Sequence, residues 1–278
     1  MTILAAILLA IVQGITEFLP VSSSGHLAIL QNIFKLSGTE GHLFFDVLLH
    51  FGTLVSICYV YRKDLRDMIQ GCVNFARGDR ENPADGQRMM PNVRMVVMII
   101  ISTLPLFLAL PFKSKIESLY YKTGFIGFAL LVTGGILYIA ERFIVNGRKN
   151  ARTMTLLDAL IIGVAQAFAL FPGLSRSGTS ISVARAFGLE KNFAVRYSLL
   201  MSIPAVLGST ILSLFSAMKS GIVWASVPAY LIGMVIAAAV GILAINVMSN
   251  LMKRGKFKVF SYYCWALGAT VLIVSIFI

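Results

Sequence analysis

Residues 13–26 read Gln-Gly-Ile-Thr-Glu-Phe-Leu-Pro-Val-Ser-Ser-Ser-Gly-His, which puts a carboxylate, a run of three serine hydroxyls and an imidazole into the first apolar stretch of the chain. Ionisable side chains are costly inside a membrane, and they usually mark functional sites. A related stretch lies 153 residues later, where residues 166–179 read Gln-Ala-Phe-Ala-Leu-Phe-Pro-Gly-Leu-Ser-Arg-Ser-Gly-Thr. The coincident pairs are Gln13/Gln166, Phe18/Phe171, Ser22/Ser175, Ser24/Ser177 and Gly25/Gly178. The two stretches predict a repeat whose halves each carry part of one site.

The composition is that of an integral membrane protein. The 278 residues are 58% hydrophobic and 13% charged, with a mean hydropathy of +0.84, whereas soluble domains have about 25% charged residues. Several apolar runs reach the roughly 20 residues that a membrane-spanning helix needs. The net charge of +12 comes from basic residues in short segments between apolar runs. That distribution is typical of membrane topology and argues against nucleic-acid binding.

The two related stretches each interrupt an apolar segment that is too short to cross a bilayer comfortably. Residues 3–16 are followed by Glu17 and Pro20, and residues 27–34 form a second short run, which as a helix covers only about 12 Å. Residues 156–171 and the Pro-Gly pair after them repeat this arrangement. Each pair of short runs predicts a re-entrant helical hairpin. Its non-helical turn requires a buried polar cavity.

Six longer apolar segments follow, three after each hairpin. They are residues 43–61, 93–112, 123–140, 193–215, 223–249 and 259–278. The predicted fold is therefore an all-α integral membrane domain of residues 1–278, with six spans and two re-entrant hairpins. Because each half has an odd number of spans, the second repeat (153–278) must be inverted relative to the first (1–145). In inverted repeats with broken helices, the site lies at the interface between the halves.

The basic residues predict the orientation. In the segments between the expected spans, 18 lysines and arginines fall on one side and five on the other, with Arg176 left inside the second hairpin. The positive-inside rule places the richer side in the cytoplasm and both termini outside. The first hairpin then enters the membrane from outside, and the second enters from the cytoplasm.

The first hairpin offers groups for acid–base or nucleophilic chemistry. Gln13 and Glu17 lie four residues apart and share one helix face. Glu17 in a low-dielectric pocket can act as a general base, bind a metal or pair with an arginine. Ser23 stands three residues before His26, a spacing at which an imidazole can activate a hydroxyl across a helix turn. His26 is itself an alternative nucleophile, and at least one serine of 22–24 is expected to cap the returning helix.

The second hairpin offers an anion site. Arg176 directly precedes the expected start of a helix, whose free N–H groups bind phosphate, and a guanidinium matches phosphate oxygens in bidentate geometry. The candidate phosphate-binding residues of both hairpins are Gln13, Ser22, Ser24, Gly173, Ser175, Ser177, Thr179 and Ser180. The alternative is a purely structural ion pair between Arg176 and Glu17.

Other polar residues carry weaker predictions. Asp46 and His50 lie one turn apart on an expected span, where His50 can line the cavity but packing or local pairing explains it equally well. Asp158 and Glu141 are expected to be solvated near the membrane edges. His42 is expected in a polar loop.

At the two motifs the chain resembles the undecaprenyl-diphosphate phosphatase family of the bacitracin-resistance type, and the resemblance covers the whole length. The family's first motif, Glu/Gln-x-x-x-Glu followed by Ser-Ser-x-Gly-His, is matched at residues 13–17 and 22–26. Its second motif, Pro-Gly-x-Ser-Arg-Ser-x-x-Thr, is matched from Pro172 onward. There are two departures: Gln13 takes the amide option at the first position, and Ser180 stands in place of the closing threonine.

The resemblance implies removal of the terminal phosphate from undecaprenyl diphosphate, which recycles the lipid carrier of cell-wall synthesis. It also implies a divalent cation, Mg²⁺ or Ca²⁺, for which Glu17 is the candidate ligand, and a site facing outside in a bacterial plasma membrane. In the expected mechanism Arg176 holds the phosphates and Ser23 or His26 attacks the terminal phosphorus. Glu17 together with His26 handles protons or the cation.

A transporter is the alternative function. Inverted repeats with broken helices suit alternating access, and a polyprenyl-phosphate flippase would need the same anion site. The Ser/His cluster favours the hydrolase, because a carrier needs no nucleophile. The expected partners are the lipid substrate and membrane lipid, with no nucleic acid. The motifs do not fix the oligomeric state, and a homodimer is left open.

Overall fold

The computed structural model of the chain describes residues 2–33, 42–78, 91–143, 147–220, 223–253 and 257–277. Within these ranges all regular structure is helical, apart from one isolated bridge between Lys149 and Leu189. This confirms the prediction of an all-α fold. His42 was expected in a polar loop, and that expectation is wrong, because it is the first residue of a long helix.

The chain forms twelve α-helices in its described part. The first seven are α1 (Ile3–Thr16), α2 (Ser23–Ile33), α3 (His42–Val60), α4 (Arg62–Ala76), α5 (Pro91–Ala109), α6 (Lys113–Ser118) and α7 (Thr123–Phe143). The remaining five are α8 (Leu156–Phe168), α9 (Arg176–Ala186), α10 (Lys191–Ser220), α11 (Val227–Lys253) and α12 (Lys258–Phe277). Short 3-10 turns occur at Leu110–Phe112, Leu119–Tyr121 and Trp224–Ser226.

Five helical segments in the described residues are long and apolar enough to cross a bilayer: residues 91–121, 123–142, 191–216, 224–252 and 258–277. The sixth expected span, residues 43–61, corresponds to α3. This helix passes the same test only together with α4, from which it is bent by 75°. The apolar helices α1 and α8 have 14 and 13 residues, short of the roughly 20 that a span requires. A multi-pass membrane protein is the architecture that these lengths support.

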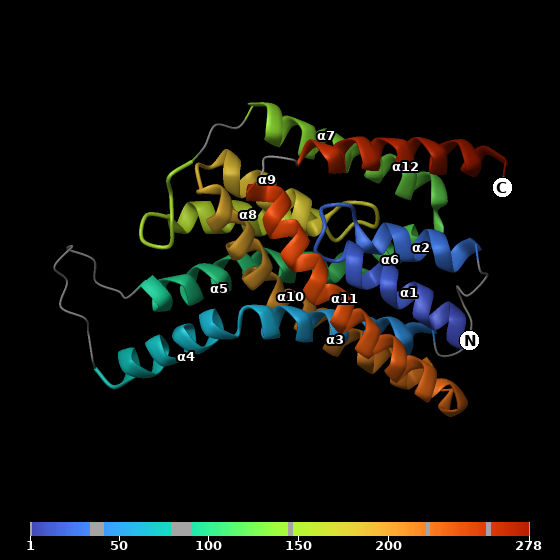
Figure 1. The fold of residues 1–278 in the computed structure, drawn as a ribbon, viewed down its shortest axis with the longest axis horizontal. Helices are drawn as coiled ribbons and strands as arrows, with labels where there is room; N and C mark the ends of the chain where they lie inside the picture. The colour runs from blue at the N-terminus through green and yellow to red at the C-terminus, as the bar shows by residue number, and fades with distance from the viewer. Residues whose placement is uncertain are drawn as a thin grey trace.

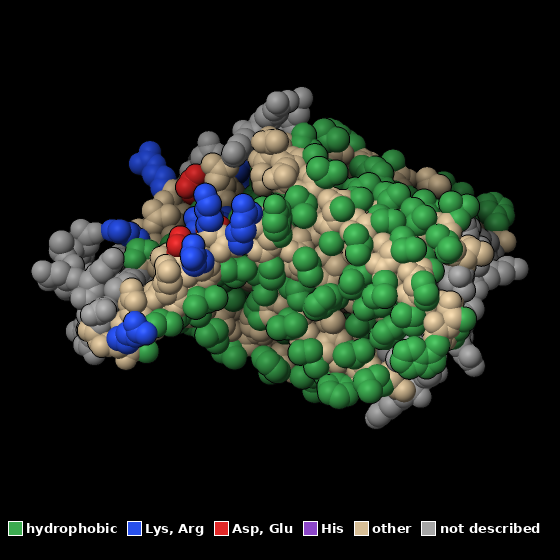
Figure 2. Space-filling view, turned by 60° about the horizontal axis from the view of Figure 1, so that its bottom comes forward, with side chains coloured by type: hydrophobic (Ala, Val, Ile, Leu, Met, Phe, Trp, Pro, Cys, Tyr) green, Lys and Arg blue, Asp and Glu red, His purple; other side chains and the backbone are tan. Residues whose placement is uncertain are grey.

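The surface agrees with a membrane environment. Figure 2 shows hydrophobic side chains over most of the face in view, whereas lysine and arginine side chains gather at one end. Large apolar side chains such as Phe107 and Leu108 are 61% and 77% exposed, which is costly in water and favourable against lipid tails.

The helices of the two halves pack against each other. In Figure 1, α7 and α12 run side by side along the top of the molecule. The first short helix, α1, packs against α11, and the second short helix, α8, packs against α5. At the centre, α3 contacts both α10 and α11. Each hairpin is therefore held by a long helix from the opposite half of the chain.

Small residues permit the closest of these contacts. At Gly163 in α8, an added Cβ would meet the backbone carbonyl of Ser102 in α5. Gly127 in α7 and Gly268 in α12 face each other, and a Cβ on Gly268 would lie 2.8 Å from the Gly127 carbonyl oxygen. Helices in lipid gain their association energy from such close backbone approach.

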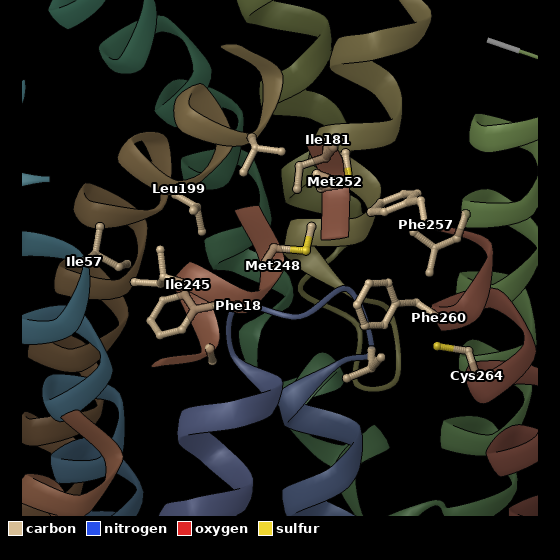
Figure 3. Packing of buried hydrophobic residues seen from close by; sticks show 14 residues of the cluster. Phe18, Ile57, Ile181, Leu199, Ile245, Met248, Met252, Phe257, Phe260 and Cys264 are labelled. Carbon is tan, nitrogen blue, oxygen red and sulfur yellow. The ribbon is translucent and has the colours of Figure 1, made fainter. Parts of the chain in front are cut away.

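An apolar core surrounds the turn of the first hairpin. Phe18, which directly follows Glu17, is fully buried and belongs to a cluster with side chains from α3, α9, α10, α11 and α12. Figure 3 shows Phe18 between Ile57, Ile245 and Met248. In lipid, side chains buried in this way stabilise the packing through their dispersion contacts with neighbouring helices. The core therefore fixes the position of the polar turn that begins one residue earlier.

Two acidic residues expected to be solvated are instead paired. Asp158 is 3% exposed, and both of its carboxylate oxygens accept from Lys149 Nζ at 2.9 Å. It also closes a capping box with Thr155 at the start of α8. Glu141 accepts from Arg185 at 3.2 Å, with side-chain exposures of 12% and 6%. The expectation of solvation was wrong because each carboxylate has a basic partner: Lys149, nine residues earlier, for Asp158, and Arg185, from a distant helix, for Glu141.

We expect Gly163→Ala to destabilise the protein, because its methyl group would press on backbone atoms of α5 that cannot move separately. Gly135→Ala is the matched control, since it also lies inside a helix and an added Cβ meets nothing within 4 Å. The melting temperature in detergent should fall by several degrees for the first variant and hold or rise for the second. Equal melting temperatures would contradict the α5–α8 packing.

Candidate functional site

The turn of the first hairpin is fixed at both ends. Glu17 caps α1, where its backbone N–H still donates to the Gln13 carbonyl. Ser22 has a φ of 69°, which is uncommon for a residue with a side chain and lets the chain reverse into α2. The Ser22 hydroxyl accepts the Gly25 N–H at 3.2 Å. Ser22 is therefore the serine that caps the returning helix, as expected for one of the three.

The second hairpin ends in the same capping arrangement. Ser175 caps α9 and accepts the Gly178 N–H at 3.1 Å. The hydroxyls of Ser175 and Ser177 lie 3.3 Å apart, and those of Ser22 and Ser24 lie 3.2 Å apart. The residue pairs that coincide in the sequence thus occupy equivalent places in the two turns. The phosphate-binding role assigned to these four serines stays a prediction.

The tips of the two hairpins touch. The Ser177 hydroxyl donates to the Leu19 carbonyl at 3.2 Å, and a Cβ on Gly25 would lie 3.2 Å from the Gly173 Cα. Gly173 itself has a φ of 93°, a conformation that favours glycine. Thr133 of α7 donates to the Gly173 carbonyl at 2.9 Å and accepts the N–H two residues later at 3.1 Å. Both turns are therefore held at one place.

An ion pair joins the hairpins at this place. Arg176 is the first residue of α9, and its Nη2 donates to Glu17 Oε1. The Glu17 side chain is 5% exposed and the Arg176 side chain is 19% exposed. In such surroundings each charge needs the other, because an unpaired buried charge is strongly destabilising. The ion pair weighed as the structural alternative is present, and it brings the two sequence motifs together.

Ser23 completes the contacts of the carboxylate. Its Oγ donates to Glu17 Oε2 at 2.6 Å, and Gln13 Nε2 donates to the same oxygen at 3.0 Å. Ser23 is the first residue of α2, the place that Arg176 holds in α9. Glu17 therefore accepts from both helix starts. A hydroxyl this close to a carboxylate is placed for removal of its proton by a base.

The expected pairing of Ser23 with His26 is absent. His26 Nδ1 lies 2.7 Å from the Ser22 carbonyl oxygen, and Nε2 lies 2.7 Å from the Tyr263 hydroxyl. The His26 ring also stacks on Tyr263, with centroids 5.7 Å apart. The expectation fails because the carbonyl one turn earlier and a residue of α12 bind the ring nitrogens. Both ring nitrogens of His26 therefore bind groups other than Glu17.

His50 joins the cluster, whereas Asp46 does not. His50 Nδ1 lies 3.1 Å from Gln13 Nε2 and 3.9 Å from Glu17 Oε2. Asp46 instead accepts from Gln31 of α2 at 2.7 Å. Of the two readings left open for His50, lining the site is therefore the one that the structure supports.

The other predicted residues take different places. Ser180 is buried, with its hydroxyl 2.6 Å from that of Ser198 in α10, and it donates to the Arg176 carbonyl at 2.7 Å. Thr179 is buried, and its hydroxyl has no partner within the described part of the chain. The Ser24 side chain lies next to that of Tyr120.

Sequence reasoning missed three residues that support the site, Thr133, Tyr120 and Tyr263. Each one contacts a motif residue from a distant helix or turn, and none stands in a recognisable pattern of its own. For Thr133 and Tyr263, the one available signal is their position in spans expected to surround the cavity. The expected position of a span places its helix near the site, but it does not tell which residue of the helix contacts the site.

The described residues do not build a metal cage. No group of three or more histidine, cysteine, aspartate or glutamate side chains in the described ranges is arranged to hold an ion. Glu17 contributes one carboxylate, and that carboxylate already accepts from three side chains. The expected divalent cation therefore does not fit a site made by the protein alone.

Comparison with known proteins agrees with the two motifs. The sequence profile of the family described as "Bacitracin resistance protein BacA" matches residues 6–270. A protein of Carboxydothermus hydrogenoformans named undecaprenyl-diphosphatase is 38% identical over 273 residues, covering 97% of this chain and 96% of the relative.

Two further relatives carry the same name. The protein of Methanobrevibacter smithii is 39% identical and covers 99% of both chains. The protein of Syntrophotalea carbinolica is 40% identical and covers 99% of this chain and all of the relative. The profile and these full-length similarities show that the chain belongs to the bacitracin resistance protein BacA family.

Proposed function

We propose that this protein hydrolyses undecaprenyl diphosphate to undecaprenyl phosphate and inorganic phosphate. The observation that carries the proposal is the contact of one carboxylate, Glu17, with a serine hydroxyl on one side and an arginine on the other. The name shared by the full-length relatives supports the same reaction. It also favours hydrolysis over the flippase alternative.

The two helix starts suit a diphosphate. The N-termini of α2 and α9 both point toward Glu17, since Ser23 and Arg176 are their first residues and both contact it. Free N–H groups and the positive end of the helix dipole attract anions. Arg176 uses Nη2 on Glu17, and among the described residues its guanidinium makes no other hydrogen bond or ion pair. Its remaining N–H groups are available for phosphate oxygens.

In the proposed reaction, the Ser23 hydroxyl attacks the terminal phosphorus and Glu17 takes the hydroxyl proton. The bond from that phosphorus to the bridging oxygen breaks, and undecaprenyl phosphate leaves with the electron pair. Water then hydrolyses the phosphoserine and releases inorganic phosphate. An incoming phosphate competes with Glu17 for the guanidinium, which frees the carboxylate to accept the proton, and positive groups stabilise the charge of the transferring phosphoryl.

Ser23 is proposed as the nucleophile in preference to His26. The Ser23 hydroxyl lies 2.6 Å from a carboxylate oxygen, whereas both nitrogens of His26 are engaged by Ser22 and Tyr263. His26 stays a predicted catalytic residue, with Tyr263 orienting its ring. These hydrogen bonds support Ser23 in the choice that the sequence left open.

Ser23→Ala and Arg176→Ala should each lower phosphate release by on the order of 100-fold or more, because one loses the nucleophile and the other the phosphate clamp. The assay uses purified protein in detergent. No membrane separates two compartments there, so phosphate release reports hydrolysis and not transport. Ser209→Ala is the control, since this exposed hydroxyl of α10 bonds only its own helix backbone. Near-normal rates in both site variants would refute the assignment.

The two halves are proposed to be inverted repeats. The main packing pairs support this. In the two halves, α1 is equivalent to α8, α3 to α10, α5 to α11 and α7 to α12, and exchanging the members of these pairs converts one packing contact into another. Under that exchange, α1 with α11 becomes α8 with α5, and α3 with α11 becomes α10 with α5. The pairs α7 with α12 and α3 with α10 convert into themselves. The matched serine caps of the two turns support the same relation.

The proposed orientation puts both termini and the site on the outer face of a bacterial plasma membrane, following the excess of basic residues on the other side. Alkaline phosphatase fused to the C-terminus should therefore be active, and a fluorescent protein fused there should be dark. Fusions after Arg148, in a basic segment expected in the cytoplasm, should behave in the opposite way. The reverse pattern would overturn the orientation.

A divalent cation is proposed to arrive with the substrate. Mg²⁺ commonly binds through one or two carboxylates together with substrate phosphates, which suits a site with a single occupied carboxylate. Calorimetry should detect no saturable Mg²⁺ or Ca²⁺ binding to the protein alone, and binding once a non-hydrolysable prenyl bisphosphonate is present. Tight binding of either ion without the bisphosphonate would contradict this. The homodimer that the motifs left open stays a prediction.

A further inference from the structure

His50 belongs to the site, but the proposed mechanism gives it no part. It lies on α3, outside both hairpins, and its Nδ1 approaches Gln13 Nε2 at 3.1 Å. Its side chain is 34% exposed, compared with 5% for Glu17. One edge of the ring therefore reaches into the buried cluster while part of the side chain stays exposed.

The contacts of Gln13 determine where the His50 proton sits. Gln13 Nε2 donates to the Glu17 carboxylate at 3.0 Å, which identifies this atom as the amide nitrogen. An amide nitrogen carries two hydrogens and does not accept hydrogen bonds. His50 Nδ1, bonded to the same nitrogen, must therefore be the acceptor. The neutral imidazole then carries its hydrogen on Nε2.

The second nitrogen of His50 is an unused donor. Nε2 has no hydrogen-bond partner within the described residues, whereas Nδ1 and the Gln13 amide nitrogen are both engaged. Ser23 Oγ and His50 Nδ1 lie 2.6 and 3.9 Å from the same oxygen of Glu17, and Arg176 occupies the other oxygen. His50 and Arg176 thus both approach the carboxylate that accepts the hydrogen bond of the attacking hydroxyl in the proposed reaction.

We propose that His50 is a phosphate-binding residue of this site, whose Nε2–H donates to the diphosphate opposite Arg176 while Gln13 holds Nδ1. The inference rests on the proposed function, because it takes its ligand from that reaction. A hydrogen bond to a charged phosphate oxygen corresponds to a loss of about tenfold or more in affinity when the donor is removed. In this role Gln13 is a positioning residue that acts through His50.

Two amide substitutions separate the two nitrogens of the ring. In His50→Asn, the short side chain places its amide near the Nδ1 position and can still accept from Gln13, but nothing reaches the Nε2 position. In His50→Gln, the longer side chain places an amide N–H near Nε2. A phosphate-binding role requires the Nε2 position, whereas a role in supporting Gln13 requires the Nδ1 position.

The measurement is the affinity of each purified variant for a non-hydrolysable prenyl bisphosphonate, with the melting temperature recorded in parallel. We expect His50→Asn to bind about tenfold or more weakly at an unchanged melting temperature, and His50→Gln to recover most of the affinity. Unchanged binding by His50→Asn would overturn the proposal. An equal loss in His50→Asn and His50→Gln would overturn it too, because the donor position would then not matter.

The same measurement keeps this proposal separate from the proposed function. If the unmodified protein binds the bisphosphonate and His50→Asn does not, the assignment of His50 stands even where no phosphate is released from the diphosphate. If the unmodified protein releases phosphate and His50→Asn binds normally, the function stands and the assignment of His50 fails. If the unmodified protein does not bind the bisphosphonate, both proposals fail.

Discussion

The ion pair between Glu17 and Arg176 is the constraint on which the rest of the site depends. The two residues are 159 positions apart and belong to different hairpins, so they meet only when both halves of the chain are packed together. The apolar cluster around Phe18 and the contact of Gly25 with Gly173 hold the two turns at that meeting point. Ser23, Gln13 and His50 are arranged around the carboxylate that this pairing fixes.

Much of the fold was predictable, because the length and hydropathy of an apolar segment identify a membrane helix in the sequence. The all-α class and five of the six spans follow from apolar runs, and Pro20 and Pro172 mark the interruptions. The bend between α3 and α4 was not predictable, since the residues at it, Val60-Tyr61-Arg62, include neither proline nor glycine. Glu141 was misjudged because its partner Arg185 lies on a distant helix, whereas the partner of Asp158, Lys149, stands nine residues earlier and was overlooked.

The site was predictable as far as its motifs reach. Glu17, Ser23 and Arg176 stood out as polar groups in apolar surroundings, and the structure joins them. The sequence could not predict which way the imidazole rings of His26 and His50 point. His26 is drawn to Tyr263 of α12, and His50, four residues from Asp46, faces Gln13 instead. Spacing along a helix tells which residues share a face, and tertiary contacts decide which of them are used.

The contact between the two hairpin tips has a consequence for how the protein is made. Ribosomes deliver the first hairpin to the membrane long before Arg176 has been synthesised, and until then the Glu17 charge lacks its partner. An unpaired carboxylate is costly at membrane depth. We therefore expect the first hairpin to reach its final position only when the second one packs against it. Ser23 and Arg176, the proposed nucleophile and phosphate clamp, are thus brought together in one late event, and a truncated chain ending before α9 lacks the arginine of the pair.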